Sequence, residues 1–278
     1  MGSGAKIFLV SLLISLCAFG LVSFIIVSAV KDGAAPTYYN VSGENTALDS
    51  SIKGESFDLL TIFTEEDGSL LSAVLLRYDR ERSEISFTPI CPKTTLDDTD
   101  LESMYLSGGV SGFMKGVYYL TGIQTQYYTL ATASGIAEAI DLVGNVRFTF
   151  DERVNVGAFS FEEGSTSLSG EMALALIRYG NAQTHREEYA AQVMRSICER
   201  LSLNDGEEAY AKICARVSTS FTKSDFAERN GLISSYGQMK KSTVELCGTY
   251  RGDGEAHYFV SDVEATLDLF SKYRKIYN

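Results

Sequence analysis

The chain has 278 residues, 45% of them hydrophobic and 22% charged, which is an ordinary composition for one large globular domain or two small ones. Its 24 basic residues are outnumbered by 36 acidic ones, leaving a formal net charge of -12. No run rich in Lys and Arg occurs. This argues against nucleic acid as a partner, because binding it requires clustered cations that neutralise phosphates.

The first element is an uncharged apolar stretch over residues 7–30. It is long enough to span a bilayer core, which needs about 20 apolar residues, and it exceeds the apolar centre of a cleaved signal peptide. We therefore predict one transmembrane anchor within residues 1–31. Lys6 precedes the apolar stretch, which favours an N-terminus on the cytoplasmic side of the membrane and a domain on the outer side. Small polar residues at 32–56 predict a stalk, followed by a domain over residues 57–278.

Three strands are predicted at the start of this domain, over residues 57–63, 70–79 and 84–90. An Asp-Gly turn joins the first two strands, so the three form a meander. The middle strand is apolar on both faces, which indicates that other elements cover both faces of the sheet.

Helices and strands then alternate. A Gly-rich break is followed by two predicted helices and two predicted strands, the second helix capped by Ser134 and stopped by Gly144. In chain order these are the break at 106–112, a helix at 113–122, a strand at 127–131, a helix at 134–144 and a strand at 145–150. The alternation predicts an α/β fold in three layers, α/β/α, around a central mixed sheet.

Two consecutive helices are predicted over residues 169–180 and 185–203. The second carries one apolar stripe at three- and four-residue steps, made of Tyr189, Ala190, Val193, Met194, Ile197 and Leu201. Arg178, His185 and Arg186 gather where the two helices meet. Free N–H groups of a helix N-terminus favour an anion, and a guanidinium adds a bidentate donor. Two readings stay open, an anion pocket or two solvated helix ends.

Further helices are predicted to begin at Ser224, with Asp225 behind it, and at Ser261, with a strand and a Gly-rich loop between them. His257 is expected at the surface or in a loop. The cysteines beyond the anchor allow three disulfide pairings, although buried free thiols are the expected state, and no Cys/His spacing suggests zinc. These cysteines are Cys91, Cys198, Cys214 and Cys247.

Five segments, in this order behind a predicted anchor, resemble the LytR-CpsA-Psr family from about Phe57 to the C-terminus. They are "LSGG" at 106–109, "AIDLVGNV" at 139–146, "SGEMALALIRYG" at 169–180, "REEYAAQVM" at 186–194 and "VSTSFTKSDF" at 217–226. The resemblance implies an α/β domain outside the membrane. It also implies a magnesium-assisted activity, the transfer of an anionic glycopolymer from a polyprenyl-pyrophosphate carrier to peptidoglycan.

The sequence departs from the family pattern where that chemistry is performed. Pro92 and Lys93 stand where the family has Arg and Asp, and Leu71 stands where it has an Asp that holds the metal. Gly180 and Tyr189 replace two further arginines. A leucine offers no oxygen to magnesium, and phosphoryl transfer depends on positioning and charge neutralisation. The resemblance therefore implies a degenerate member without a metal site or cofactor.

We accordingly expect a non-catalytic, membrane-anchored protein of bacterial envelope assembly, with a polyprenyl-(pyro)phosphate pocket formed by Arg178, Arg186, Lys93 and His185. Its expected partners are the cytoplasmic membrane, such a lipid phosphate and other envelope proteins. One alternative is an active, Mg²⁺-dependent phosphotransferase. It requires replacement metal ligands, for which Glu65, Glu66 and Asp67 are candidates, although an acidic hairpin turn is the commoner role of such a run. The other alternative is a protein-interaction scaffold.

Overall fold

The computed structural model describes residues 55–144, 146–182, 188–252 and 257–273. All of them belong to one compact unit, Asn45–Arg274. The predicted anchor, and the predicted stalk except for residues 55 and 56, lie outside the described residues. Within the part of the chain that is described, no helix is both long and apolar enough to cross a membrane.

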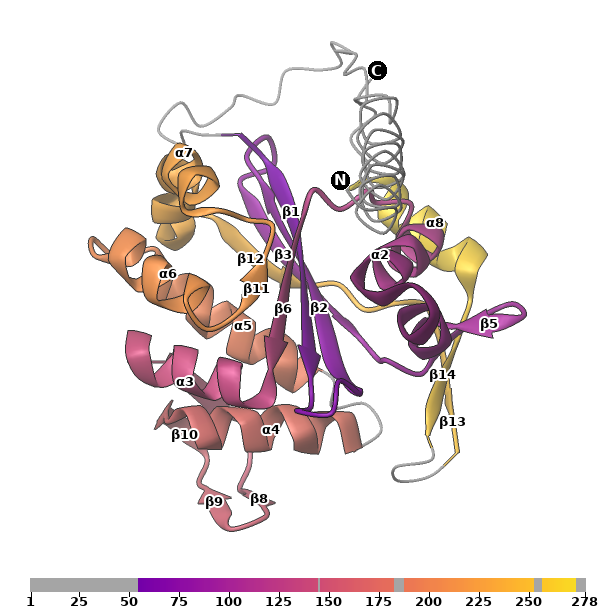
Figure 1. Ribbon diagram of the computed structural model, residues 1–278, viewed down its shortest axis with the longest axis horizontal. Helices are drawn as coiled ribbons and strands as arrows, with labels where there is room; N and C mark the ends of the chain where they lie inside the picture. The colour runs from indigo at the N-terminus through magenta and orange to yellow at the C-terminus, as the bar shows by residue number, and fades with distance from the viewer. Residues whose placement is uncertain (1–54, 145, 183–187, 253–256, 274–278) are drawn as a thin grey trace, which may run out of the picture. The chain divides into compact units, whose positions relative to one another are not determined.

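A six-stranded mixed sheet forms the centre of the unit, in the order β11-β6-β1-β2-β3-β12 (Figure 1). Strand β2 pairs antiparallel with β1 and β3, which confirms the predicted meander, whereas β6 and β12 add parallel to β1 and β3. The strands are β1 Phe57–Thr64, β2 Leu70–Asp79, β3 Glu84–Ile90, β6 Tyr127–Thr132, β11 Ser218–Thr219 and β12 Lys240–Thr243. The predicted mixed α/β fold with a central mixed sheet is thus confirmed.

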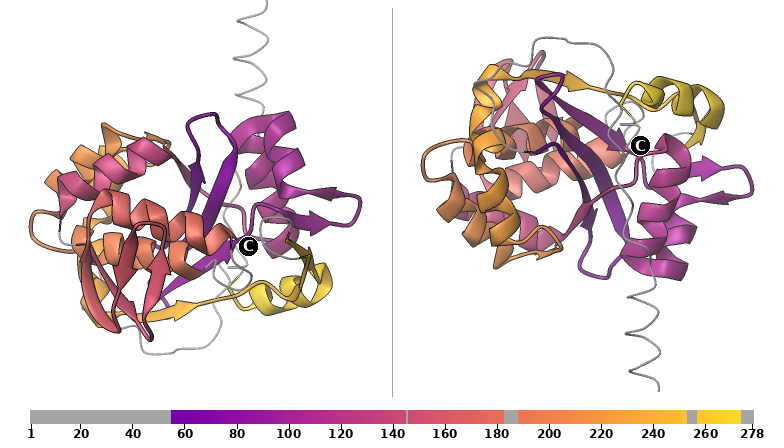
Figure 2. Two further views of the ribbon diagram at one scale, coloured as in Figure 1. Left: turned by 90° about the horizontal axis from the view of Figure 1, so that it is seen from below. Right: turned by 90° about the horizontal axis from the view of Figure 1, so that it is seen from above.

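Helices cover both faces of this sheet, as the two views of Figure 2 show. On one face lie α3 Ala133–Val143, α4 Gly170–Ala182, α5 Glu188–Leu201, α6 Gly206–Cys214 and α7 Lys223–Ser234, the last continued by the short helix η1 Ser235–Gln238. On the other face lie α2 Leu101–Thr121 and α8 Val263–Ser271. The two apolar clusters meet opposite faces of β2, all ten of whose residues are buried.

Three small sheets complete the unit. Strand β7, predicted from sequence, does not join the central sheet, because it pairs antiparallel with β10 instead. The remaining pairs are β8 with β9 and the four-stranded group β13-β14-β4-β5. Their bounds are β4 Thr94–Leu96, β5 Thr99–Asp100, β7 Val146–Phe150, β8 Val154–Val156, β9 Phe159–Phe161, β10 Gly164–Leu168, β13 Gly248–Arg251 and β14 Tyr258–Ser261.

The predicted Gly-rich break lies inside a helix. Helix α2 begins at Leu101, capped by the Asp100 side chain, which accepts a hydrogen bond from the Ser103 N–H. The break appears as a kink at Gly109, whose φ of 59° and ψ of −147° are not helical. Glycine tolerates this backbone conformation because it has no Cβ.

The expected cap of α3 was wrong by two residues. Thr132 caps the helix, because its hydroxyl accepts the Gly135 N–H, and the Ser134 N–H is used elsewhere. An N-cap must combine extended backbone with a side-chain acceptor, and Thr132 satisfies both. The predicted stop at Gly144 is confirmed, because Gly144 has a positive φ and its N–H donates to the Ile140 carbonyl.

Two other expected starts were also displaced. Helix α7 is capped by Thr222 rather than Ser224, since Thr222 and Asp225 bond reciprocally as a capping box. Helix α8 is capped by Asp262 rather than Ser261. In each case several Ser, Thr and Asp residues compete within three positions. The predicted apolar stripe of α5 is confirmed, because all six of its residues are buried.

The predicted state of the cysteines holds in part. Cys91 and Cys198 are buried, whereas Cys214 and Cys247 are half-buried. Burial raises the pKa of the Cys198 thiol to about 12. His257 lies in a loop just before β14, as one part of the expectation had it, but it is not at the surface, because only 2% of it is exposed and its ring lies 6.0 Å from that of Tyr250.

We predict that Gly170→Ala lowers the free energy of unfolding by about 1–3 kcal/mol, because overpacking forces backbone to move. Gly170 lies at the start of α4, where its N–H donates to Asp141 Oδ1 at 2.7 Å. A Cβ at this position would lie 2.0 Å from the backbone carbonyl oxygen of Ala137 on α3. The control is Gly237→Ala, where nothing lies within 4 Å of the added atom. Urea unfolding measures both, and equal midpoints would contradict the close approach of α3 and α4.

We also predict that Cys198 resists alkylation in the folded protein at pH 8. Raising its pKa from 9.0 to about 12 cuts the reactive thiolate about a thousandfold. Peptide mass spectrometry after iodoacetamide treatment should find Cys198 unmodified until denaturant is added. Because the folded state keeps a proton that the unfolded state loses, this thiol should also lower stability as pH rises from about 9 towards 12. Equal labelling rates before and after unfolding would refute the burial.

Candidate functional site

The carboxyl ends of β1, β6, β3 and β12 meet at one edge of the central sheet. The strand registers fix this placement, since Thr64 of β1 pairs with Thr132 of β6 and β3 ends opposite Ala73 near the start of β2. The β1–β2 turn, the start of α3 and the residues after β3 therefore lie along this edge. Ligands of open α/β sheets commonly bind outside the carboxyl ends of strands.

Arg178 reaches this edge from α4 and binds the β1–β2 turn. Its Nε donates to Glu65 Oε1 at 2.7 Å and its Nη2 to Oε2 at 2.5 Å. The two side chains keep 48% and 32% of their surface exposed. These hydrogen bonds raise the pKa of Arg178 further. The guanidinium thus presents two parallel donors to a two-oxygen anion, the arrangement that also suits phosphate.

The acidic turn that Glu65 begins does not gather its carboxylates around one point. Glu66 accepts the Ser134 N–H at 2.7 Å, which lowers the pKa of Glu66. Asp67 accepts the N–H and hydroxyl of Ser69 at 2.9 and 2.6 Å, which lower its pKa in the same way. Among the described residues no group of three or more His, Cys, Asp or Glu side chains is placed to hold a metal ion.

The other predicted phosphate ligands are only partly placed. Lys93 is exposed just beyond β3, and its carbonyl accepts the Phe259 N–H of β14 at 3.1 Å. His185 and Arg186 lie outside the described residues, so a pocket of four residues stays a prediction. Leu71, where the resemblance led us to expect a metal-binding Asp, is 5% exposed within the core.

Sequence reasoning missed an apolar cavity between the sheet and helices α3, α5, α6 and α7. Its volume is about 70 Å³ and its walls are almost wholly apolar. Ala131 and Ile136, on either side of Ser134, contribute at the end nearer the carboxyl edge. The wall also includes Ala139, Met194 and Cys198.

Aromatic rings close the far end of this cavity, where β1 and β6 begin. Phe57 stacks on Tyr78 and Phe221, with ring centroids 4.8 and 5.2 Å apart. The Arg229 guanidinium lies over the rings of Tyr127 and Phe57, at 5.1 and 5.9 Å.

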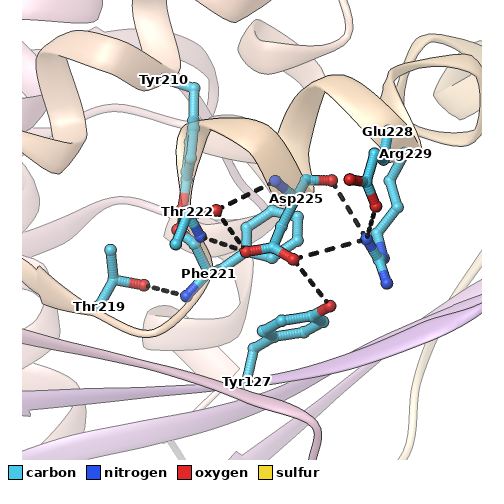
Figure 3. A network of polar contacts seen from close by, with 8 residues as sticks. All are labelled: Tyr127, Tyr210, Thr219, Phe221, Thr222, Asp225, Glu228 and Arg229. Carbon is cyan, nitrogen blue, oxygen red and sulfur yellow. Dashed lines mark hydrogen bonds and ion pairs between the residues drawn. The ribbon is translucent and has the colours of Figure 1, made fainter.

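Hydrogen bonds fix this closed end, which includes part of the segment at 217–226 that resembles the family (Figure 3). The Tyr127 hydroxyl donates to Asp225 at 3.1 Å, and the Tyr210 hydroxyl donates to the Phe221 carbonyl at 2.5 Å. Because Asp225 also forms the capping box of α7, it ties that helix to β6. The aromatic packing of Phe221 and the capping of α7 thus account for this segment.

Solved structures resemble this unit. A transcriptional regulator from Enterococcus faecalis aligns over 79% of this chain and 87% of its own, with 17% identity and a TM-score of 0.65. TagV from B. subtilis aligns over 80% and 96%, with 18% identity and a TM-score of 0.64. A structure of TagT bound to LIIa-WTA aligns over 84% and 97%, with 16% identity and a TM-score of 0.62. At these identities the likeness establishes the fold.

No curated protein sequence matches the chain. The sequence does match the family model described as the LytR_cpsA_psr family, over residues 83–274. This match covers more than half of the chain and includes the paired helices, α3 and the segment at 217–226. The chain belongs to the LytR_cpsA_psr family, whose members serve cell-envelope assembly.

Proposed function

We propose that this protein is anchored in the cytoplasmic membrane, faces outward and binds a polyprenyl-linked phosphate without transferring it. The observation that carries the proposal is an apolar cavity whose α3 wall begins at the sheet edge where Arg178 holds the Glu65 carboxylate. The apolar wall would receive part of the isoprenoid chain, since burying apolar surface is favourable by about 25 cal/mol per Å². The guanidinium would hold the phosphate.

The cavity requires adjustment to take such a chain. A volume of about 70 Å³ accommodates only a short piece of an isoprenoid. Met194 on its wall is unbranched and adapts easily to a new shape. We therefore propose that the ligand enlarges the cavity as it enters.

Three features support binding without transfer. Leu71 is buried in the core and offers no oxygen. Pro92 brings no charge to the position of the family's arginine. The carboxylates of Glu65 and Glu66 are engaged with Arg178 and Ser134. Phosphoryl transfer relies almost entirely on cations and positioned donors, so their loss removes catalysis before it removes binding.

We predict that the full-length chain in detergent micelles binds farnesyl diphosphate, and that Arg178→Ala weakens this binding about tenfold or more, as expected for lost charged hydrogen bonds. The matched control is Arg153→Ala, which removes an exposed arginine also paired with a glutamate, Glu162, but from the β8–β9 hairpin. Calorimetry with and without Mg²⁺ should give the same affinity, and no farnesyl phosphate should be released.

The other outcomes separate the alternatives. Affinity that Mg²⁺ strengthens, together with release of farnesyl phosphate and inorganic phosphate, would show phosphoryl transfer to water and favour the phosphotransferase alternative. Absence of binding would refute the lipid-phosphate proposal and leave the alternative that the domain is a scaffold for envelope proteins. In that case partners recovered from membranes should persist in the Arg178→Ala protein.

The cavity is tested by a second variant. Ala139→Leu adds apolar atoms to the cavity wall and should weaken farnesyl diphosphate binding several-fold while leaving binding of inorganic pyrophosphate unchanged. Ala173→Leu is the control, because Ala173 is fully buried on α4 away from the cavity. Overpacking there should cost about 1–3 kcal/mol of stability without selective loss of the prenyl ligand. Unchanged affinity of the Ala139→Leu protein would show that the isoprenoid chain binds outside this cavity.

A further inference from the structure

Glu65 already occupies the position on Arg178 that a phosphate would take. Its two carboxylate oxygens accept from Nε and Nη2 at 2.7 and 2.5 Å, which are the donors of a bidentate phosphate contact. A ligand phosphate and the Glu65 carboxylate therefore compete for the same two N–H donors of Arg178.

We infer that Glu65 is a resident anion that every ligand of Arg178 must displace, so that weakly held, singly charged phosphodiesters leave the site unfilled. This inference rests on the proposed lipid-phosphate function. Glu65 carries one negative charge, as does the phosphodiester of an ordinary phospholipid, so neither has an electrostatic advantage at Arg178. A terminal phosphate group carries about −1.5 to −2 at pH 7 and wins the exchange. A membrane-anchored protein is surrounded by phosphodiesters, and Glu65 would keep them from filling the site.

The geometry of the turn permits Glu65 to leave. The turn is closed by its own backbone, because the Glu65 N–H donates to the Ser69 carbonyl at 2.9 Å and the Gly68 N–H to the Glu65 carbonyl at 3.0 Å. The Glu65 side chain can therefore swing away while β1 and β2 stay joined. Ion pairs between half-exposed side chains contribute little, so a doubly charged ligand can replace this one.

The neighbouring glutamate supplies a matched control. Glu66 carries the same charge one residue away, but its carboxylate accepts the Ser134 N–H rather than an arginine donor. Glu65→Gln and Glu66→Gln thus remove equal charge from the same turn. Only Glu65→Gln frees the Nε and Nη2 donors of Arg178.

The test measures two probes on the full-length chain in uncharged detergent micelles. They are farnesyl diphosphate and dihexanoyl phosphatidylglycerol, a short phosphodiester lipid with one negative charge. Glu65→Gln should raise affinity for both probes by a similar factor, about fivefold, because each probe must displace the same carboxylate and the ion pair is a weak one. Glu66→Gln should stay within about twofold of the unmodified protein for both probes.

A double-mutant cycle separates occupancy from general charge repulsion. In an Arg178→Ala background the gain from Glu65→Gln should vanish, because no guanidinium is left to compete for. A gain that persists there, or one equal to that of Glu66→Gln, overturns the role of Glu65 while the proposed function stands. Loss of affinity in Glu65→Gln would likewise overturn it, by showing that Glu65 positions Arg178 for its ligand. If neither probe binds any variant, the proposed function fails, and this inference with it.

Discussion

The burial of β2 on both faces is the constraint on which the rest of the structure depends. All ten residues of Leu70–Asp79 are shielded from water, so neither face of the central sheet can be left open. Helices α2 and α8 cover one face, and α3 to α7 cover the other. The candidate site lies at one edge of the sheet, beyond both covered faces. Arg178 meets Glu65 at the edge where β1, β3 and β6 end, and this edge is also the one closest to the α3 end of the cavity.

Local pattern predicted the elements better than it predicted their limits. The meander and the stripe of α5 follow from side-chain periodicity, which a sequence displays directly. Helix starts were misplaced at Ser134, Ser224 and Ser261, because a serine, threonine or aspartate nearby made the better hydrogen bond. Strand β7 was recognised, but its partner β10 was not, because pairing between strands depends on the path of the chain and not on either strand alone.

The same difference between local and distant information separates the two halves of the candidate site. Arg178 could be identified from its place in a recognisable helix. Its contact with Glu65 joins residues 113 positions apart, and an acidic turn in an acidic chain looks like solvated surface. The cavity was hidden for another reason. It exists because the side chains around Ala131 and Ala139 leave space unfilled, and periodicity reports which residues are buried but not how completely they pack.

Pairing with a carboxylate does not by itself mark an arginine as functional in this acidic chain. Arg153, Arg200 and Arg216 also pair with Glu162, Asp205 and Glu138. Arg200 even forms a bidentate pair, but its partner Asp205 lies only five residues away. The Arg200 Nε donates to the Val143 carbonyl, so this arginine fastens the end of α5 to the end of α3. The hydrogen bonds described for Arg178 go to Glu65 alone, on a turn that closes without them. Exchange of one anion for another therefore leaves the fold intact at Arg178, whereas at Arg200 it would undo a helix contact.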